Sequence, residues 1–145
     1  KNENTEVSSI NDIINKLVTK YENKKVETDL TENFEINVRP NSIKRCLSNL
    51  IDNGLSYGKN VKISTKKTLN NLIILVDDDG PGIPENEYKN VIKPFYRIDK
   101  SRGQNKSGVG LGLSITNDIV RSHGGDISLD KSPTSGLRVK ISLPF

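Results

Sequence analysis

The sequence predicts an α/β fold, a two-layer sandwich in which three helices cover one face of a mixed sheet of about five strands. Apolar residues recur at helical spacing in three segments, and short apolar runs bounded by turn residues indicate strands between them. Along the chain the order is helix, strands, helix, two strands, long loop, helix and two strands. This order suits a single sheet that carries its helices on one face.

Each predicted helix has a recognisable beginning or end. The first follows a capping serine, the second begins at about Pro40 and ends before Gly58, and the third ends before Gly124-Gly125. Because Pro84 and the acidic residues near it can start a helix, we also expect a short helix to about Ile92. The first main helix is predicted after a cap at Ser8 or Ser9, with apolar positions from Ile10 to Val18, and the other two at about 40–57 and about 111–123.

The predicted strands come in pairs, and a long loop separates the last two pairs. Residues 93–110 contain glycines and polar groups without a helical stripe, and loops of this length in compact domains are usually functional or disordered. We therefore expect a long functional or disordered loop here. The strands are predicted at 24–30, 35–38, 61–67, 72–77, 126–130 and 137–143.

The composition of the 145 residues suits one domain, residues 1–145, with 32% hydrophobic and 28% charged residues. The net charge of +4 fits a lysine-rich chain, and the scarcity of aromatic residues near the basic ones argues against nucleic-acid binding. Cys46 is the single cysteine and lies on an apolar helical stripe, so we expect a buried, inert thiol.

Several features concern the cellular setting of the chain. The longest aliphatic run, Leu72–Val76, is too short to span a bilayer, and no signal peptide is visible. The chain contains no methionine, so we expect it to be a piece of a longer protein. A cytoplasmic location is the simplest expectation, with a parent protein that could be anchored in the inner membrane.

Three side chains on the second predicted helix form a first candidate site. Asn49, Asn53 and Tyr57 are spaced four residues apart and therefore share one face. A solvated polar stripe would explain the asparagines about as well. A side-chain amide oxygen is nevertheless a hard, neutral ligand that suits Mg²⁺, which takes phosphate oxygens as further ligands.

The segment Asp78-Asp79-Gly80-Pro81-Gly82-Ile83 follows a predicted strand. An ionised Asp78 only accepts hydrogen bonds, so it matches the exocyclic amine of adenine and opposes the carbonyl of guanine. The adjacent glycines let a flat ring approach the backbone. An acidic turn is the alternative, because D-G and P-G are ordinary turn signals.

A second glycine stretch, Gly108-Val109-Gly110-Leu111-Gly112-Leu113, leads into the third helix. Free N–H groups at a helix start can bind phosphate oxygens. This stretch is not the dinucleotide GxGxxG motif, and the chain contains no GxxxxGK[ST], which excludes a P-loop. Arg97 and Arg102 precede it and could close over phosphates, although solvated surface arginines are an equal alternative.

The ordered set of these segments is more specific than any one of them. It resembles the ATP-binding catalytic domain of bacterial sensor histidine kinases, of the GHKL superfamily, and is most similar to osmosensor-type, EnvZ-like kinases. The likeness extends from about Val7 to Pro144. Its motifs are Asn49–Asn53 (N box), Asp78–Gly82 (G1 box), Lys93–Arg97 (F box) and Gly108–Leu113 (G2 box).

This resemblance implies the Bergerat sandwich fold and ATP and Mg²⁺ as cofactors. Asp78 would bind adenine, Gly80, Gly82 and Ile83 would shape its pocket, and Tyr57 would pack on the base. Asn53 would ligate Mg²⁺. The resemblance also implies a mobile lid at about 93–108. Under it the phosphates would be bound by Asn49, Arg97, Arg102 and the stretch Gly108, Val109, Gly110, Leu111, Gly112 and Leu113.

Four residues depart from the family pattern. Ser56 stands where a basic residue is usual near the phosphates, and Ile92 replaces the first F-box phenylalanine. Gly54 replaces the usual alanine and should loosen its helix by about 1 kcal/mol. Arg138 stands where a small hydroxyl residue is common. None of these changes removes the expected base or metal ligands.

The resemblance further implies a kinase that donates the γ-phosphoryl group of ATP to a histidine of a separate dimerisation domain. The one histidine of the chain, His123, lacks the flank of a phosphoacceptor and is expected to be structural. A response regulator would be a further partner, and a monomeric fragment of a homodimeric parent is expected. An ATPase of the same superfamily would carry Glu at the Asn49 position, and a degenerate nucleotide-sensing module is another alternative.

Overall fold

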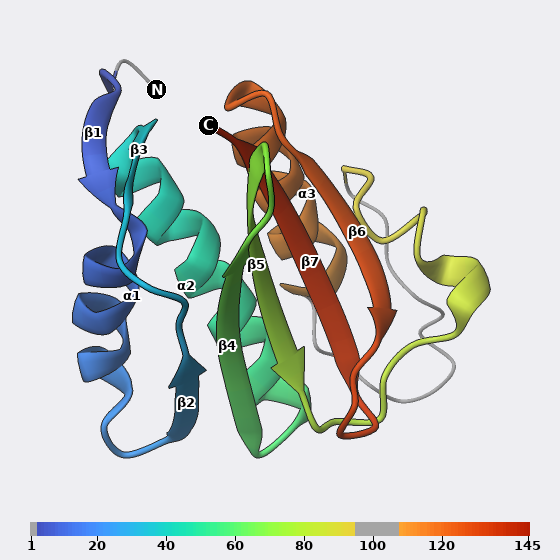
Figure 1. Cartoon of the computed structure of the whole chain (residues 1–145). Coiled ribbons are helices and arrows are strands. Elements are labelled where there is room, and N and C mark those ends of the chain that lie inside the picture. Colours follow the sequence, from blue (N-terminus) through green and yellow to red (C-terminus); the bar gives the residue numbers. More distant parts are fainter. Residues whose placement is uncertain (1–2, 95–107) are drawn as a thin grey trace.

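The computed structural model describes residues 3–94 and 108–145, and Figure 1 shows their arrangement. The helices are α1 (Ile10–Val18), α2 (Pro40–Tyr57) and α3 (Gly108–Ser122), with the short 3-10 turns η1 (Thr19–Tyr21) and η2 (Glu85–Glu87). The strands are β1 (Glu6–Ser9), β2 (Lys25–Asp29), β3 (Glu35–Val38), β4 (Asn60–Lys67), β5 (Asn71–Asp78), β6 (Asp126–Lys131) and β7 (Leu137–Pro144).

The main sheet has five strands in the order β2-β4-β5-β7-β6. β2 runs parallel to β4, and the other neighbours are antiparallel, which confirms the predicted mixed sheet. In this register Asp78, the last residue of β5, lies opposite Val61 of β4, and Asp77 lies opposite Arg138 of β7. The end of β5 therefore meets the start of both neighbouring strands.

The three helices lie together on one face of this sheet, so the predicted two-layer sandwich is confirmed (Figure 1). In β4, Val61 and Ile63 are buried against the helices, whereas Lys62 between them is exposed on the other face. The core that joins the two layers includes Ile14, Leu17, Ile43, Leu47, Leu50, Ile51, Ile63, Ile74, Leu113 and Ile141.

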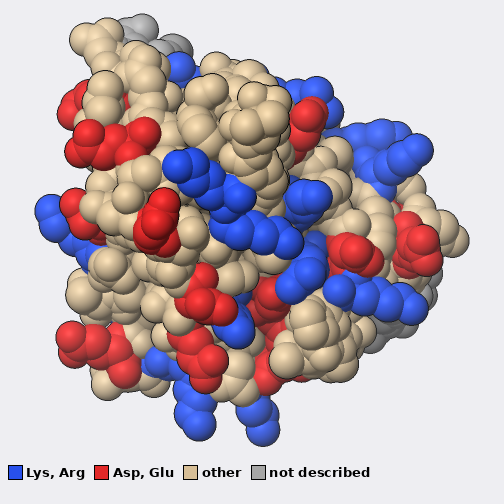
Figure 2. Space-filling view, viewed as in Figure 1, with Lys and Arg blue, Asp and Glu red and all other residues tan. Residues whose placement is uncertain are grey.

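The open face of the sheet carries side chains of both charges, as Figure 2 shows. Ile73 and Leu75 of β5 point to this face, yet they are only 6% and 8% exposed. Their cross-strand neighbours are Lys66 and Lys140, whose aliphatic stems can cover them while the ammonium groups stay in water. This mixture of charges explains why the face needs no further layer.

A strand that the sequence did not predict precedes α1. β1 pairs antiparallel with β3 in a separate two-stranded sheet, so the strands at 24–30 and 35–38 belong to different sheets. The prediction missed β1 because Val7, its only large apolar residue, is 67% exposed and leaves no alternating pattern.

Two further boundaries differ from the prediction. The short helix expected from Pro84 to Ile92 is confined to the 3-10 turn η2, where the backbone N of Glu87 donates to the O of Pro84 and that of Tyr88 to the O of Glu85, each three residues back. α3 begins at Gly108 instead of Leu111. Glycine can adopt helical backbone at a cost of about 1 kcal/mol, so a glycine-rich stretch does not fix where a helix begins.

Both the start and the end of α2 are held by carboxylates from outside the helix. Oε2 of Glu3 accepts a hydrogen bond from the backbone N of Asn41 at 2.7 Å, and Oε1 accepts one from that of Ser42 at 3.0 Å. These are N–H groups that the first turn cannot satisfy itself. At the other end, Asp79 binds the turn after the helix through the backbone N of Lys59.

Cys46 of α2 is 1% exposed and lies in the core, as predicted for an inert thiol. Its burial raises the pKa of the thiol to about 12, so the thiolate is absent at neutral pH. Among the described helices, none is long and apolar enough to cross a bilayer.

Candidate nucleotide-binding site

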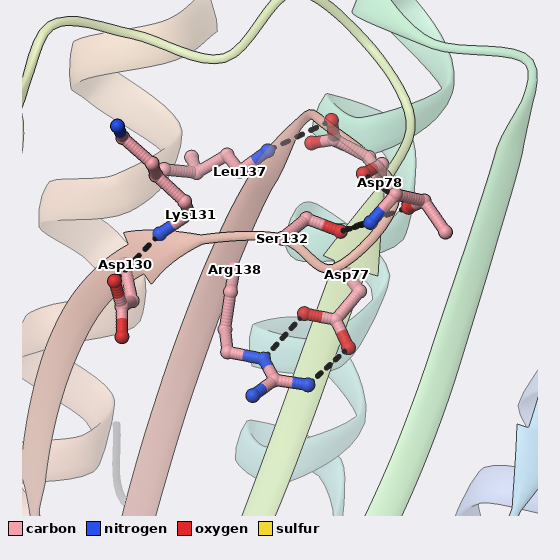
Figure 3. Close-up of polar contacts among 8 residues, drawn as sticks. Asp77, Asp78, Asp130, Lys131, Ser132, Leu137 and Arg138 are labelled. Atoms are coloured by element: carbon pink, nitrogen blue, oxygen red, sulfur yellow. Dashed lines mark hydrogen bonds and ion pairs between the residues drawn. The ribbon is translucent and has the colours of Figure 1, made fainter.

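Asp78 is a buried carboxylate at the end of β5, with 9% of its surface exposed. Its Oδ1 accepts hydrogen bonds from the backbone N of Gly80 at 2.9 Å and of Leu137 at 3.1 Å, the latter drawn in Figure 3. Oδ2 accepts none from the described residues. One oxygen is therefore fixed by the backbone, and the other is left for a ligand.

The surroundings of Asp78 set its pKa above the ordinary value of an aspartate. Burial is the main cause, because a low-dielectric environment disfavours the charged form. The two backbone N–H groups oppose this rise, whereas the carboxylates of Asp79 and Asp77 add to it.

The turn between β6 and β7 encloses this carboxylate, and the sequence did not identify it. A Cβ built on Gly136 would lie 2.0 Å from Oδ1 of Asp78, so no other residue fits there without moving Asp78. Oγ1 of Thr134 donates to the backbone O of Asp78 at 3.1 Å. The one signal in the sequence was a Ser-Gly turn before the last strand, which is too common to indicate a site.

The predicted G1 glycines lie against the same turn. Gly82 has φ +72°, a conformation that favours glycine, and its Cβ position would be 3.4 Å from the carbonyl oxygens of Ser135 and Gly136. Ser135 itself has φ +86°, and its Oγ donates to the backbone O of Gly80 at 3.3 Å. Two loops far apart in the sequence thus form one wall beside Asp78.

The end of α2 lies next to this wall. Asn49, Asn53 and Tyr57 are all partly exposed, and partial burial raises the pKa of the Tyr57 hydroxyl. A Cβ built on Gly80 would lie 2.7 Å from the backbone O of Tyr57. The structure therefore brings the end of α2 into direct contact with the loop that follows Asp78.

The structure shows the surroundings of Gly54 and Ser56, two of the residues that depart from the family pattern. Gly54 faces Asp78, since its Cβ position is 3.2 Å from Cβ of Asp78 and 2.6 Å from Cγ2 of Val61. Its effect is thus on packing as well as on helix propensity. Ser56 is exposed, and its Oγ donates to the backbone O of Asp52 at 3.0 Å, so it adds no cation to the site.

Arg138 lies on the opposite face of the sheet. Its Nε and one terminal nitrogen donate to Oδ1 and Oδ2 of Asp77 at 2.7 and 3.0 Å, and Figure 3 shows the pair pointing away from Asp78. This departure therefore places no side chain against Asp78.

The expected phosphate end is defined by the backbone of α3. Gly108, Val109, Gly110, Leu111 and Gly112 form the first turns of this helix, and Leu113 is fully buried in the core. The predictions for Arg97, Arg102 and most of the lid fall outside the described residues. Ile83 is half-buried and packs against the core beside Gly82.

Asn53 was expected to ligate Mg²⁺, and its side-chain amide oxygen has the chemistry of a ligand for a hard cation. Within residues 3–94 and 108–145, no group of three or more His, Cys, Asp or Glu side chains could hold a metal. Asn53 is a partly exposed residue of α2, on the same helical face as Tyr57. This donor set suits Mg²⁺, which takes few protein ligands and keeps water or phosphate oxygens.

His123 at the end of α3 has both ring nitrogens in contact with backbone groups. Its Nε2 accepts a hydrogen bond from the backbone N of Arg39 at 3.0 Å, and Nδ1 lies 2.8 Å from the backbone O of Ile119. The neutral tautomer with the proton on Nδ1 satisfies both contacts. His123 thus connects the end of α3 to the start of α2.

The site is thus one buried carboxylate, bordered by glycines, where the helix layer meets the ends of β5 and β7. Residues 38–145 match the family described as "Histidine kinase-, DNA gyrase B-, and HSP90-like ATPase". The chain belongs to this family, and its fold is that of the catalytic domain of sensor histidine kinases.

Named relatives agree with this assignment. The chain is 42% identical over 106 residues to the sensor histidine kinase GtrS of Pseudomonas aeruginosa, which covers 73% of this chain and 22% of GtrS. It is 40% identical over 119 residues to the histidine-protein kinase ArlS of Staphylococcus aureus, covering 79% of this chain and 26% of ArlS. The chain thus spans about a quarter of the length of these curated relatives.

A solved structure shows the same architecture. The histidine kinase domain of the E. coli osmosensor EnvZ superposes with a TM-score of 0.75 at 32% sequence identity. The match covers 99% of this chain and 91% of that domain, so the likeness extends over the whole fold.

Proposed function

We propose that this domain binds Mg-ATP and donates the γ-phosphoryl group to a histidine on a separate dimerisation domain of its parent protein. The observation that carries the proposal is the hydrogen bonding of the Asp78 carboxylate. Two backbone N–H groups occupy Oδ1, and Oδ2 accepts no hydrogen bond from the described residues. An ionised carboxylate in this state accepts the exocyclic amine of adenine and repels the carbonyl of guanine.

The rest of the base pocket follows from the residues around Asp78. Gly80, Gly82 and Ile83 form the wall beside the carboxylate, and Tyr57 supplies a half-buried aromatic ring for the flat face of the base. The backbone of Tyr57 lies against Gly80, so the residue that carries the ring is fixed next to the wall.

The triphosphate extends from this pocket toward the start of α3. The free N–H groups and the positive dipole end of a helix favour phosphate there. The first turn of α3, Gly108 to Leu111, supplies them, and Gly112 and Leu113 follow in the next turn. Asn49 assists from α2, and Arg97 and Arg102 close over the phosphates from the lid at about 93–108. Phosphoryl transfer needs positioning and charge neutralisation more than covalent chemistry from the protein.

Asn53 is the protein ligand for Mg²⁺ in this proposal, alongside the phosphate oxygens. When bound, the ion neutralises phosphate charge during transfer. A neutral amide holds it without adding a negative charge beside the triphosphate. Asn49, also an amide, is a poor general base, which favours transfer to a histidine over activation of water.

The phosphoacceptor lies outside this chain. Because both nitrogens of His123 contact backbone groups, attack by either of them on ATP would require that corner of the fold to open. The partners are therefore a histidine-bearing domain of a dimeric parent protein and a response regulator in two-component signal transduction. The site works in the cytoplasm.

Two assays test this function. Calorimetric titration with ATP and GTP, with and without Mg²⁺, should show Mg²⁺-dependent binding that prefers ATP. With radiolabelled ATP, label should remain off the isolated domain and appear on an added histidine-bearing domain of the parent. Steady phosphate release by the isolated domain would instead indicate an ATPase, and nucleotide binding without any transfer would indicate a sensing module.

A further inference from the structure

Asp79 follows Asp78 directly, but its side chain belongs to a different contact. Its Oδ1 accepts hydrogen bonds from the backbone N of Lys59 at 2.7 Å and of Asn60 at 2.9 Å. Oδ2 accepts a third from Nδ2 of Asn60 at 2.7 Å. The carboxylate thus ties the turn between α2 and β4 to the loop after β5.

These hydrogen bonds keep Asp79 charged. The bonds from the backbone and side chain of Asn60 are the main causes that lower the pKa of Asp79 below the ordinary value, and the bond from Lys59 adds to them. Since the group is ionised across the physiological range, the three bonds persist whenever the domain is folded.

The two segments that Asp79 joins are in backbone contact. A Cβ built on Gly58 would lie 2.5 Å from Oδ1 of Asp79 and 2.8 Å from the backbone N of Gly80. In the reverse direction, a Cβ built on Gly80 would lie 2.7 Å from the backbone O of Tyr57. With glycine on both sides, no side chain can act as a spacer, so the hydrogen bonds of Asp79 fix the separation.

The contact lies between the two residues that hold the base in the proposed function. Tyr57 immediately precedes Gly58, and Asp78 immediately precedes Asp79. We infer that Asp79 is a positioning residue for the nucleobase: its carboxylate sets the spacing between the Tyr57 ring and the Asp78 carboxylate. This inference rests on the proposed nucleotide binding and adds a residue that does not itself touch the nucleotide.

A role confined to turn stability would affect every ligand alike, so the test separates the base from the phosphates. Asp79→Ala should lower the affinity for ATP about tenfold, because three bonds to a charged group are lost at once. The affinity for inorganic tripolyphosphate should stay within about twofold, because the contacts at α3 are unchanged. Both are measured calorimetrically below the unfolding transition, which circular dichroism locates for each variant.

The matched control is Asp126→Ala. It removes the same charge from an exposed aspartate at the start of β6, whose nearest basic group is Arg121 at 3.9 Å. In register Asp126 lies opposite Ser142, near the end of β7 that is remote from Leu137 and Asp78. The Asp126→Ala variant should bind ATP and tripolyphosphate with the affinities of the wild type.

A reciprocal exchange gives a variant that keeps the turn intact. In Asp79→Asn the amide oxygen can still accept from the backbone N–H groups, but the amide nitrogen meets Nδ2 of Asn60, which places two donors face to face. Adding Asn60→Asp restores a donor–acceptor pair. ATP affinity should fall several-fold in the single variant and return to within about twofold of wild type in the double variant.

The outcomes separate this inference from the proposed function. A wild-type domain that binds no ATP would overturn both. If the wild type binds ATP but Asp79→Ala keeps that affinity, or loses ATP and tripolyphosphate affinity equally, only the positioning role is wrong. Failure of Asn60→Asp to rescue Asp79→Asn would contradict it as well.

Discussion

Asp77 and Asp78 are adjacent carboxylates in opposite surroundings. Asp77 points to the open face of the sheet and meets the guanidinium of Arg138 through two hydrogen bonds. Asp78 points to the helix side, where Oδ1 meets two backbone N–H groups and the described residues include no cation bound to it. A cation neutralises the first carboxylate and joins two strands, whereas uncharged donors orient the second and leave its charge for a ligand.

The largest expected effect comes from removing the charge of Asp78. In Asp78→Asn, the amide oxygen can accept from Gly80 and Leu137, and the amide nitrogen then takes the place of Oδ2 and faces the adenine amine. Loss of a hydrogen bond to a charged group, about 1.5–3 kcal/mol, should weaken ATP binding about 10- to 150-fold in calorimetry. The domain should stay folded, and an unchanged ATP affinity would exclude Asp78 as the base-binding group.

A substitution of Arg138, on the other face of the sheet, should lower the stability of the domain without changing its affinity for ATP. Arg138→Met keeps the apolar stem and leaves the carboxylate of Asp77, 7% exposed, without its cation. Removing one partner of a fully buried pair costs about 3–5 kcal/mol, and the 29% exposure of Arg138 should reduce this to about 1–2 kcal/mol. Urea unfolding measures the loss.

ATP affinity serves as the control for that variant and should stay within about twofold of wild type, because Arg138 lies across the sheet from Asp78. The double variant Asp77→Asn/Arg138→Met removes both charges and should recover part of the stability. A loss of ATP binding larger than the loss of stability would contradict the separation of the two faces.

The sequence predicts those contacts of Asp78 that come from residues near it in the chain, and it misses those that come from distant residues. Asp78 and the glycines that follow it are close in the sequence, so a base-binding role could be predicted from these residues alone. The four-residue spacing of Asn49, Asn53 and Tyr57 likewise predicted that they share one helical face. Gly136 and Leu137 were missed because they reach Asp78 only through the pairing of β5 with β7. That register is a property of the assembled sheet.

Acid should reveal the electrostatic state of Asp78. Because burial raises the pKa of Asp78, the folded protein binds a proton here more readily than the unfolded chain. This group's contribution to stability therefore falls as pH rises through the window above the ordinary aspartate value of about 3.9.

The binding of ATP should show the opposite trend in the same window. Protonation converts the free oxygen of Asp78 from an acceptor into a donor, so ATP affinity should drop as pH falls, beginning above about 3.9. Calorimetry across pH measures this step. Asp78→Asn, which has no charge to lose, should lack it, and an identical pH profile in both proteins would refute the assignment.

The smallest expected effect on stability comes from Glu3, a carboxylate that accepts hydrogen bonds from backbone N–H groups at the start of α2. Burial opposes its ionisation, but the hydrogen bonds from Asn41 and Ser42 outweigh it and lower the pKa of Glu3. Its contribution to stability is therefore present above the ordinary glutamate value of about 4.3 and is lost as pH falls. Here the N–H groups dominate, whereas at Asp78 burial dominates.

Glu3→Gln keeps one acceptor oxygen and should lower the free energy of unfolding at neutral pH by about 0.5–1 kcal/mol, the size of a helix-cap effect. Urea unfolding should show that the difference from wild type shrinks in acid. ATP affinity should not change, and a difference in stability that grows as pH falls would contradict the capping role.

The most direct test of the account is the ratio of ATP to GTP affinity in the wild type and in Asp78→Asn, measured calorimetrically under one set of conditions. The account predicts a clear preference for ATP in the wild type and its disappearance in the variant, because a single carboxylate oxygen distinguishes an amine from a carbonyl. Equal affinities in the wild type, or an undiminished preference in the variant, would contradict it.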